Sequence, residues 1–88
     1  MRIWGKIWKD NHMLKNMTVT DDSADTRTHK IFRSLEEICR EWDLSVPVWL
    51  DANIREFKQN KKSRFSQDNF VGEEINFDYL ELQILEED

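Results

Sequence analysis

The sequence predicts an α+β fold in which a three-stranded antiparallel sheet carries helices packed on one face. The elements are expected in the order strand, strand, helix, helix, strand. Apolar and polar residues alternate through residues 2–9, 13–20 and 77–85, which is typical of strands with one buried face. Between residues 26 and 43 the apolar residues recur every three or four positions, as they do along one side of a helix. Helices packed on one face would bury the apolar side of a three-stranded sheet and so stabilise it.

The first two strands are expected to form a hairpin. Residues 2–9 place their isoleucines on one face and Trp4 and Trp8 on the other. The same spacing also fits a helical stripe, but a glycine, β-branched isoleucine and aromatic residues together favour a strand. Asp10-Asn11 then forms the turn, because both residue types tolerate the backbone angles of a tight reversal.

The segment 26–43 is the strongest helical pattern in the chain. An acidic loop, Asp21–Asp25, precedes it and offers an N-cap directly before the helix. A second possible start lies at Ser34, where Ser-Leu-Glu-Glu has the form of a capping box, and would leave residues 26–32 extended. The apolar face of the full helix comprises Ile31, Phe32, Leu35, Ile38, Cys39 and Trp42.

A second helix is predicted after Pro47, which ends any continuation of the first one. Asp51 is expected to cap it, and it should end near residue 60. Within this helix Ile54 and Phe57 are expected to face inward.

Residues 60–74 are predicted to be a loop anchored by Phe65 and Phe70. The residue types that favour a loop there are those of Ser63, Ser66, Asn69 and Gly72. The alternating segment 77–85 follows as the third strand and most simply joins the edge of the hairpin. Its apolar side comprises Leu80, Leu82 and Ile84.

The length of 88 residues predicts a single domain, residues 1–88, with one core. Four tryptophans and five phenylalanines are the largest apolar side chains, and we expect the core to be rich in tryptophan. The one cysteine cannot form an internal disulfide, and no stretch is apolar enough for a signal peptide or a membrane span. These features predict a soluble cytoplasmic protein without a membrane partner.

The charge is unevenly divided along the chain. The net charge of −5 argues against a general nucleic-acid coat. Residues 55–64 nevertheless hold five basic residues against one acidic residue, whereas residues 73–88 hold seven acidic residues and no basic one. We expect the two stretches to attract each other within the fold.

No catalytic or cofactor motif is found. Cys39 lies on the apolar stripe, where a thiol behaves as a small buried hydrophobe. Asp21, Ser23 and Asp25 resemble the opening of a calcium loop, but Thr26 stands where that loop requires glycine. We therefore predict no catalytic residues, no cofactor and no metal, and we expect the protein not to be an enzyme.

The tryptophans of the first strand are candidates for a contact surface. If the isoleucines of that strand are buried, Trp4 and Trp8 lie on the opposite face beside Arg2 and Lys6, where they could stack on bases or on a partner. Two alternatives stay open: the tryptophans form the buried face, or both faces are covered. The candidate contact residues are Trp4, Trp8, Arg55, Lys58, Lys61, Lys62 and Arg64.

Several stretches together resemble a family of small uncharacterised proteins from clostridial-type bacteria. They are RIWGKIWKD (2–10), DTRTHKIF (25–32), VPVWLDANIREF (46–57), RFSQDNF (64–70) and FDYLELQILEED (77–88). The resemblance covers nearly the whole chain. It implies no activity and assigns no functional residues.

The leading functional hypothesis is a non-enzymatic accessory or protein-interaction domain with a protein partner. The alternative is a nucleic-acid contact module that uses the basic segment 55–64 and exposed tryptophans. A small hydrolase with a carboxylate-metal site is a third possibility, because 18 acidic residues offer many pairs. An exposed edge strand would also permit a dimer.

Overall fold

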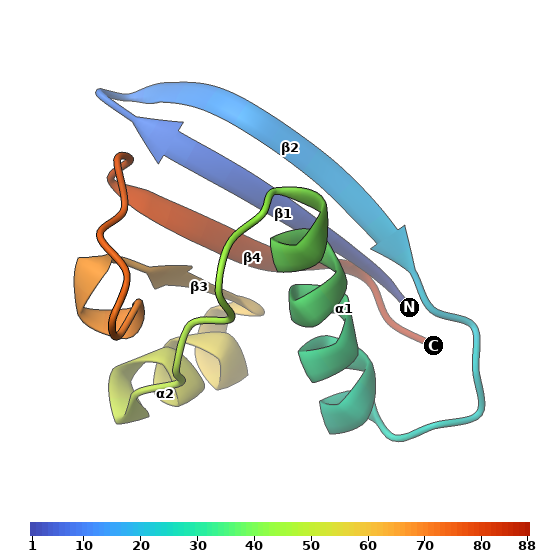
Figure 1. Ribbon diagram of the computed structural model, residues 1–88. Coiled ribbons are helices and arrows are strands. Elements are labelled where there is room, and N and C mark those ends of the chain that lie inside the picture. The colour runs from blue at the N-terminus through green and yellow to red at the C-terminus, as the bar shows by residue number, and fades with distance from the viewer.

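The computed structural model describes residues 1–88 and confirms the α+β class, with two helices and an antiparallel sheet. The strand order in the sheet is β2-β1-β4-β3, and both helices lie on the same side of it (Figure 1). No helix is long and apolar enough to cross a membrane. The elements are β1 (Arg2–Lys9), β2 (His12–Thr20), α1 (Arg27–Glu41), α2 (Asp51–Asn60), β3 (Lys62–Phe65), a 3-10 turn (Gln67–Asn69) and β4 (Tyr79–Glu86).

The predicted hairpin is confirmed. β1 and β2 pair antiparallel, and the turn residues Asp10 and Asn11 have φ angles of 51° and 65°. Two consecutive left-handed residues match the right-handed twist of the flanking strands, and asparagine and aspartate adopt this conformation more readily than most residues. β4 pairs with the other side of β1, as the sequence predicts.

The prediction of three strands is wrong, because residues 62–65 form a fourth strand, β3, on the free edge of β4. Ser63 and Phe65 point into the protein and are fully buried, whereas Lys62 and Arg64 point away from it. Four residues are too few for alternation to be distinguished from a loop. What makes them a strand is the pairing with β4, whose paired residues lie 15 to 21 positions further along the chain.

α1 begins at Arg27, and the Thr26 hydroxyl accepts a hydrogen bond from the His29 backbone N–H at 3.2 Å. The alternative start at Ser34 is wrong, since Ser34 is buried in the middle of the helix. The helix packs closely on β1. A Cβ atom added at Gly5 would lie 2.8 Å from Ile38 Cδ1, so any other residue at this position would require the Ile38 side chain to shift.

α2 differs in detail from the prediction. Its N-cap is Leu50, and Asp51 is the first helical residue. The predicted inward face is half wrong: Phe57 is buried, but Ile54 is 42% exposed and Asn53 takes the inward position. Asn53 and Phe57 are four residues apart and therefore share one side of the helix, whereas Ile54 is rotated by about 100° from Asn53.

The core lies between the sheet and the helices, and it consists mainly of isoleucine, leucine and phenylalanine. The prediction of a tryptophan-rich core is wrong, because all four tryptophans remain partly exposed. Trp42 and Trp49 pack against the margin of the core. The parity of β1 directs Ile3 and Ile7 toward the helices, so its tryptophans point to the uncovered face. The core comprises Met1, Ile3, Ile7, Val19, Ile31, Leu35, Ile38, Cys39, Phe57, Phe65, Phe70, Leu80, Leu82 and Ile84.

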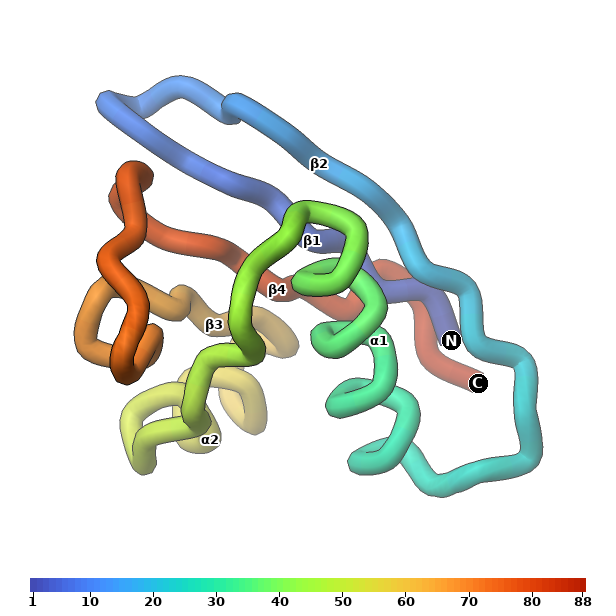
Figure 2. Tube along the Cα trace, in the orientation of Figure 1, coloured from blue at the N-terminus to red at the C-terminus, as the bar shows by residue number.

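The two chain ends lie side by side, next to the start of α1 (Figure 2). The terminal amino group of Met1 and the Lys30 side chain both bind the Asp88 carboxylate. Lys30 is buried, so its ammonium group depends on this carboxylate for compensation.

Candidate functional site: a groove between the helices

The structure does not gather the seven candidate contact residues into one surface. Trp4 and Trp8 on β1 lie on the open face of the sheet, together with Lys62 and Arg64 on β3. Arg55 and Lys58 lie on α2, which belongs to the helix layer on the opposite side of the sheet, and Lys61 is its C-cap residue. The seven candidate contact residues are therefore divided between two sides of the protein.

On the open face, Lys6 and Glu81 form an ion pair between neighbouring central strands. Lys6 Nζ lies 2.8 Å from Glu81 Oε1, and each side chain is only 7% exposed. Burial raises the pKa of Glu81, but hydrogen bonding to Lys6 and the nearby positive charges outweigh it, so the pKa lies below its usual range. The Glu81 carboxyl therefore stays ionised at neutral pH.

The cations of the open face also cover its aromatic rings. Lys6 Nζ stands 4.0 Å from the centre of the Trp4 ring, and the Arg64 guanidinium stands 4.6 Å from that of Tyr79. Arg64 Nε is 3.6 Å from Glu81. Two rings and two cations of this face are thus occupied by partners within the chain. The sequence did not suggest this cluster, because positions 6 and 81 are joined only by strand pairing.

The helix layer contains an apolar groove between α1 and α2. The segment 46–50 crosses this layer and places the Trp49 ring in the groove, 5.7 Å from Phe32 and 5.5 Å from Phe57. One stretch of the groove has a volume of about 240 Å³, and an adjoining stretch that shares Phe32 and Trp49 has about 160 Å³. The apolar lining comprises Ile31, Phe32, Leu35, Val46, Trp49, Ile54 and Phe57.

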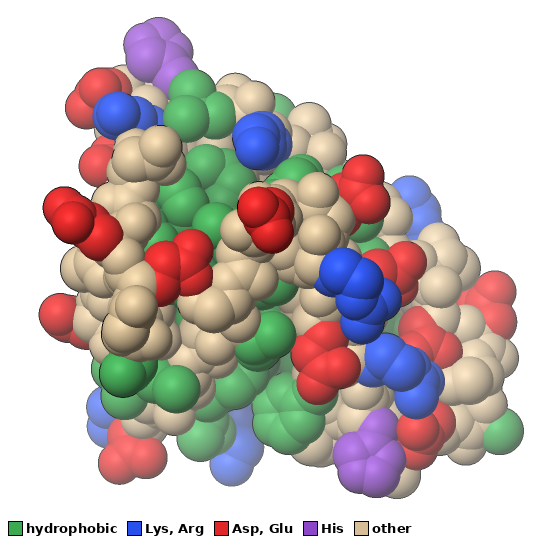
Figure 3. Space-filling view, viewed as in Figure 1, with side chains coloured by type: hydrophobic (Ala, Val, Ile, Leu, Met, Phe, Trp, Pro, Cys, Tyr) green, Lys and Arg blue, Asp and Glu red, His purple; other side chains and the backbone are tan.

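Exposed apolar side chains surround this groove. Between 42% and 50% of each side chain's residue surface remains open to solvent, and in the space-filling view hydrophobic side chains gather over the helix layer (Figure 3). A contiguous apolar surface of this kind marks an interaction site more often than isolated exposed residues do. Phe32, Val46 and Ile54 line the groove itself, and Val48 and Leu50 are exposed on the neighbouring segment 46–50.

A buried hydrogen-bond network holds the segment 46–50 in place. Asn69 Nδ2 donates to the carbonyl oxygen of Val48 at 2.8 Å, and Asn53 Oδ1 accepts from the Leu50 N–H at 3.0 Å. Asn69 Nδ2 also donates to Asn53 Oδ1 at 2.7 Å. Both asparagines are buried, so the position of Trp49 depends on two polar residues whose role no local sequence pattern indicates.

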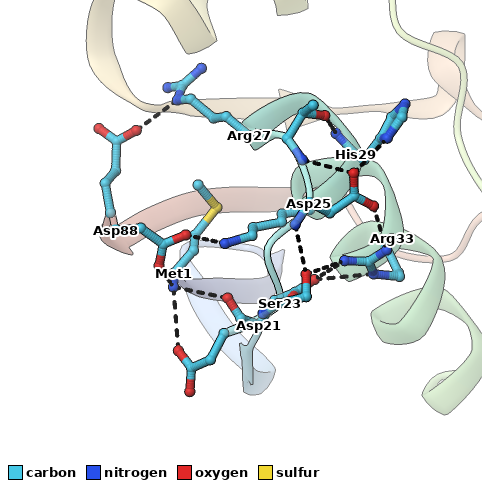
Figure 4. A network of polar contacts seen from close by, with 12 residues as sticks. Met1, Asp21, Ser23, Asp25, Arg27, His29, Arg33 and Asp88 are labelled. Atoms are coloured by element: carbon cyan, nitrogen blue, oxygen red, sulfur yellow. Dashed lines mark hydrogen bonds and ion pairs between the residues drawn. The ribbon is translucent and has the colours of Figure 1, made fainter.

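The acidic loop before α1 forms a polar cluster around Arg33 (Figure 4). The Arg33 guanidinium donates to Asp21 at 2.6 Å, to Asp25 at 3.0 Å and to the Ser23 hydroxyl at 2.9 Å. The three oxygen-bearing residues that resemble a calcium loop thus contact an arginine. No three His, Cys, Asp or Glu side chains come together in a way that could hold a metal ion.

Acid is expected to weaken this cluster. Hydrogen bonds from His29, from the Thr26 N–H and from Arg33 lower the pKa of Asp25 to about 2, and hydrogen bonds from Ser23 and Arg33 lower that of Asp21. Carboxylates with lowered pKa values stabilise the fold above their ordinary value of 3.8, and this contribution is lost as the pH falls through the folded-state values.

We therefore expect the free energy of unfolding, measured by urea titration, to fall below about pH 4, and to fall less steeply in Arg33→Met. Arg40→Met is the matched control, because Arg40 is exposed on the same helix and has no ion-pair partner. If the free energy of unfolding fell equally steeply with decreasing pH in Arg33→Met and in the wild type, the lowered pKa values would not arise from this cluster.

Cys39 lies on the inner face of α1 and is fully buried, as the sequence predicts. Burial, together with the negative charge of Glu73, raises the pKa of its thiol to about 12. The thiol is therefore protonated at neutral pH and is a poor nucleophile.

Comparisons with models of known protein families, with curated proteins and with solved structures found no match.

Proposed function

We propose that this chain is a non-enzymatic protein-interaction domain that docks a protein partner in the groove between α1 and α2. The observation that supports this function is the contiguous apolar lining, with Phe32 and Ile54 each more than 40% exposed at its rim. Leaving such side chains in water is unfavourable, and a partner that covers them gains the free energy of their burial. Trp49 is the central anchor, because aromatic residues in apolar grooves dominate the binding energy of most interfaces.

Site-specific photo-cross-linking in the source cells tests this function. A photoreactive residue at Ile54 is expected to give one discrete adduct, whereas the same residue at Val71, which is 73% exposed outside the groove, should give none. Phe32→Asp should reduce the Ile54 adduct at least tenfold, because it places a charge against the apolar lining. Equal adducts at both positions, or an adduct insensitive to Phe32→Asp, would argue against the groove.

A nucleic-acid contact module is the second candidate function. It is favoured by Trp8 and Tyr79, which lie directly opposite each other on the two central strands of the sheet, and a base that stacks on Tyr79 would displace the Arg64 guanidinium. Aromatic residues on such a sheet stack bases in one common class of RNA-binding domain. Under this candidate, single-stranded RNA or DNA should shift in a mobility assay at low salt, and Trp8→Ala with Lys62→Glu should abolish the shift. No shift of either nucleic acid would eliminate it.

A further inference from the structure

We propose that the occupant of the groove is a short amphipathic segment whose apolar side chains enter the groove and whose acidic residues lie at the α2 end. This inference rests on the proposed function and adds the chemistry of the partner. It is drawn from the charges at the two ends of the groove and from a carboxylate that the protein already binds beside one of them.

The two ends of the groove differ in charge. Arg27 and Lys58 line the end formed by the start of α1 and by α2, whereas Glu36 lines the opposite end. Lys58 is exposed and has no ion-pair partner within the chain. Carboxylates of a bound segment would therefore be attracted to the α2 end and repelled from the Glu36 end, which gives the occupant a preferred direction.

The cationic end already binds a carboxylate of the same chain. Glu87 Oε1 lies 2.6 Å from Arg27 Nε, and Glu87 Oε2 lies 2.9 Å from Lys61 Nζ. Hydrogen bonds from Lys61 and Arg27 hold the pKa of Glu87 below its usual range. This contact brings together the basic 55–64 and acidic 73–88 stretches of the sequence. It also shows that these cations bind a carboxylate.

Two cations of α2 remain free for a second carboxylate. Arg55 and Lys58 are three residues apart and therefore lie on neighbouring turns of α2, and Lys61 follows them as its C-cap residue. Lys61 is paired with Glu87, while neither Arg55 nor Lys58 takes part in an ion pair. A partner carboxylate beside Ile54 would therefore meet Lys58 without breaking an existing contact.

The length of the groove limits the occupant to a short segment. Its α1 wall runs from Arg27 to Glu36, which corresponds to about 13 Å at the helical rise per residue. This distance accommodates about two turns of an amphipathic helix, with two or three apolar anchors. Docking of such a segment in a groove is an established mode of peptide recognition.

Selection from a displayed random-peptide library tests this inference. Peptides enriched on the wild-type protein are expected to combine two or three large apolar residues with aspartate or glutamate toward one end. Against Lys58→Glu, an enriched acidic peptide should bind at least tenfold more weakly, and selection on this variant should favour lysine and arginine instead. Lys62→Glu is the matched control, because Lys62 is equally unpaired but lies on the open face of the sheet, and it should change the affinity less than twofold.

Three other outcomes would overturn the inference in distinguishable ways. Enriched peptides that are neutral or basic, yet still depend on Phe32, would refute the acidic partner and leave the groove in place. Peptides that bind Phe32→Asp as well as the wild type would refute both the inference and the proposed function. Self-association in light scattering that Phe32→Asp abolishes would identify a second copy of this chain as the occupant.

Discussion

Asn53→Leu is expected to lower the free energy of unfolding by about 3 kcal/mol or more, although leucine has nearly the same size as asparagine. The buried Asn53 amide donates to Ser63 Oγ and to the Arg64 carbonyl oxygen, both at 2.8 Å. Its oxygen accepts from Leu50 N at 3.0 Å. Each buried polar group left without a partner costs about 1–3 kcal/mol, and leucine would leave several of them unpaired.

Asn60→Leu is the control for this prediction, because Asn60 is exposed at the end of the same helix. It should change the stability by no more than about 0.5 kcal/mol, as surface substitutions usually do. Urea denaturation of both variants measures the difference. If Asn53→Leu lowered the free energy of unfolding no more than Asn60→Leu does, the hydrogen-bond network would not be what holds the segment 46–50. Since Trp49 lies on that segment, Asn53→Leu should also weaken binding in the groove.

Lys6→Met is expected to lower the free energy of unfolding by about 3 kcal/mol at neutral pH, because it leaves the buried Glu81 carboxylate without its main counter-charge. The double variant Lys6→Met, Glu81→Leu should recover most of this loss, since apolar residues can replace a buried ion pair at little cost. Arg64→Met should have a smaller effect, because Arg64 is 59% exposed and stands further from Glu81.

The pH dependence provides a second measurement on the same pair. The folded-state pKa of Glu81 is lowered, so its ion pair stabilises the protein above the ordinary value of 4.5 and this contribution is lost in acid. The difference in free energy of unfolding between Lys6→Met and the wild type should therefore become smaller as the pH falls and Glu81 becomes protonated. A difference that is constant with pH, or no recovery in the double variant, would show that Lys6 acts through packing alone.

Five of the six helices and strands follow from local sequence patterns, apart from one or two residues at their ends. The hairpin rests on alternation around Asp10-Asn11, and α1 on the periodic stripe 31–42. α2 and β4 follow from the residues after Pro47 and from the alternation of 77–85. Alternation and helical period are properties of neighbouring residues, so they can be recognised without knowing what the elements pack against.

The site depends on contacts between distant parts of the chain. The sequence by itself determined that Trp4 and Trp8 oppose Ile3 and Ile7, but only the packing of α1 on Gly5 decided which pair is buried. Strand pairing likewise made β3 a strand and joined Lys6 to Glu81. The groove arises because Asn53 and Asn69 hold a segment between two helices and leave half of the Phe32 surface open. Burial and pairing depend on the whole fold, and for that reason the tertiary structure alone decided them.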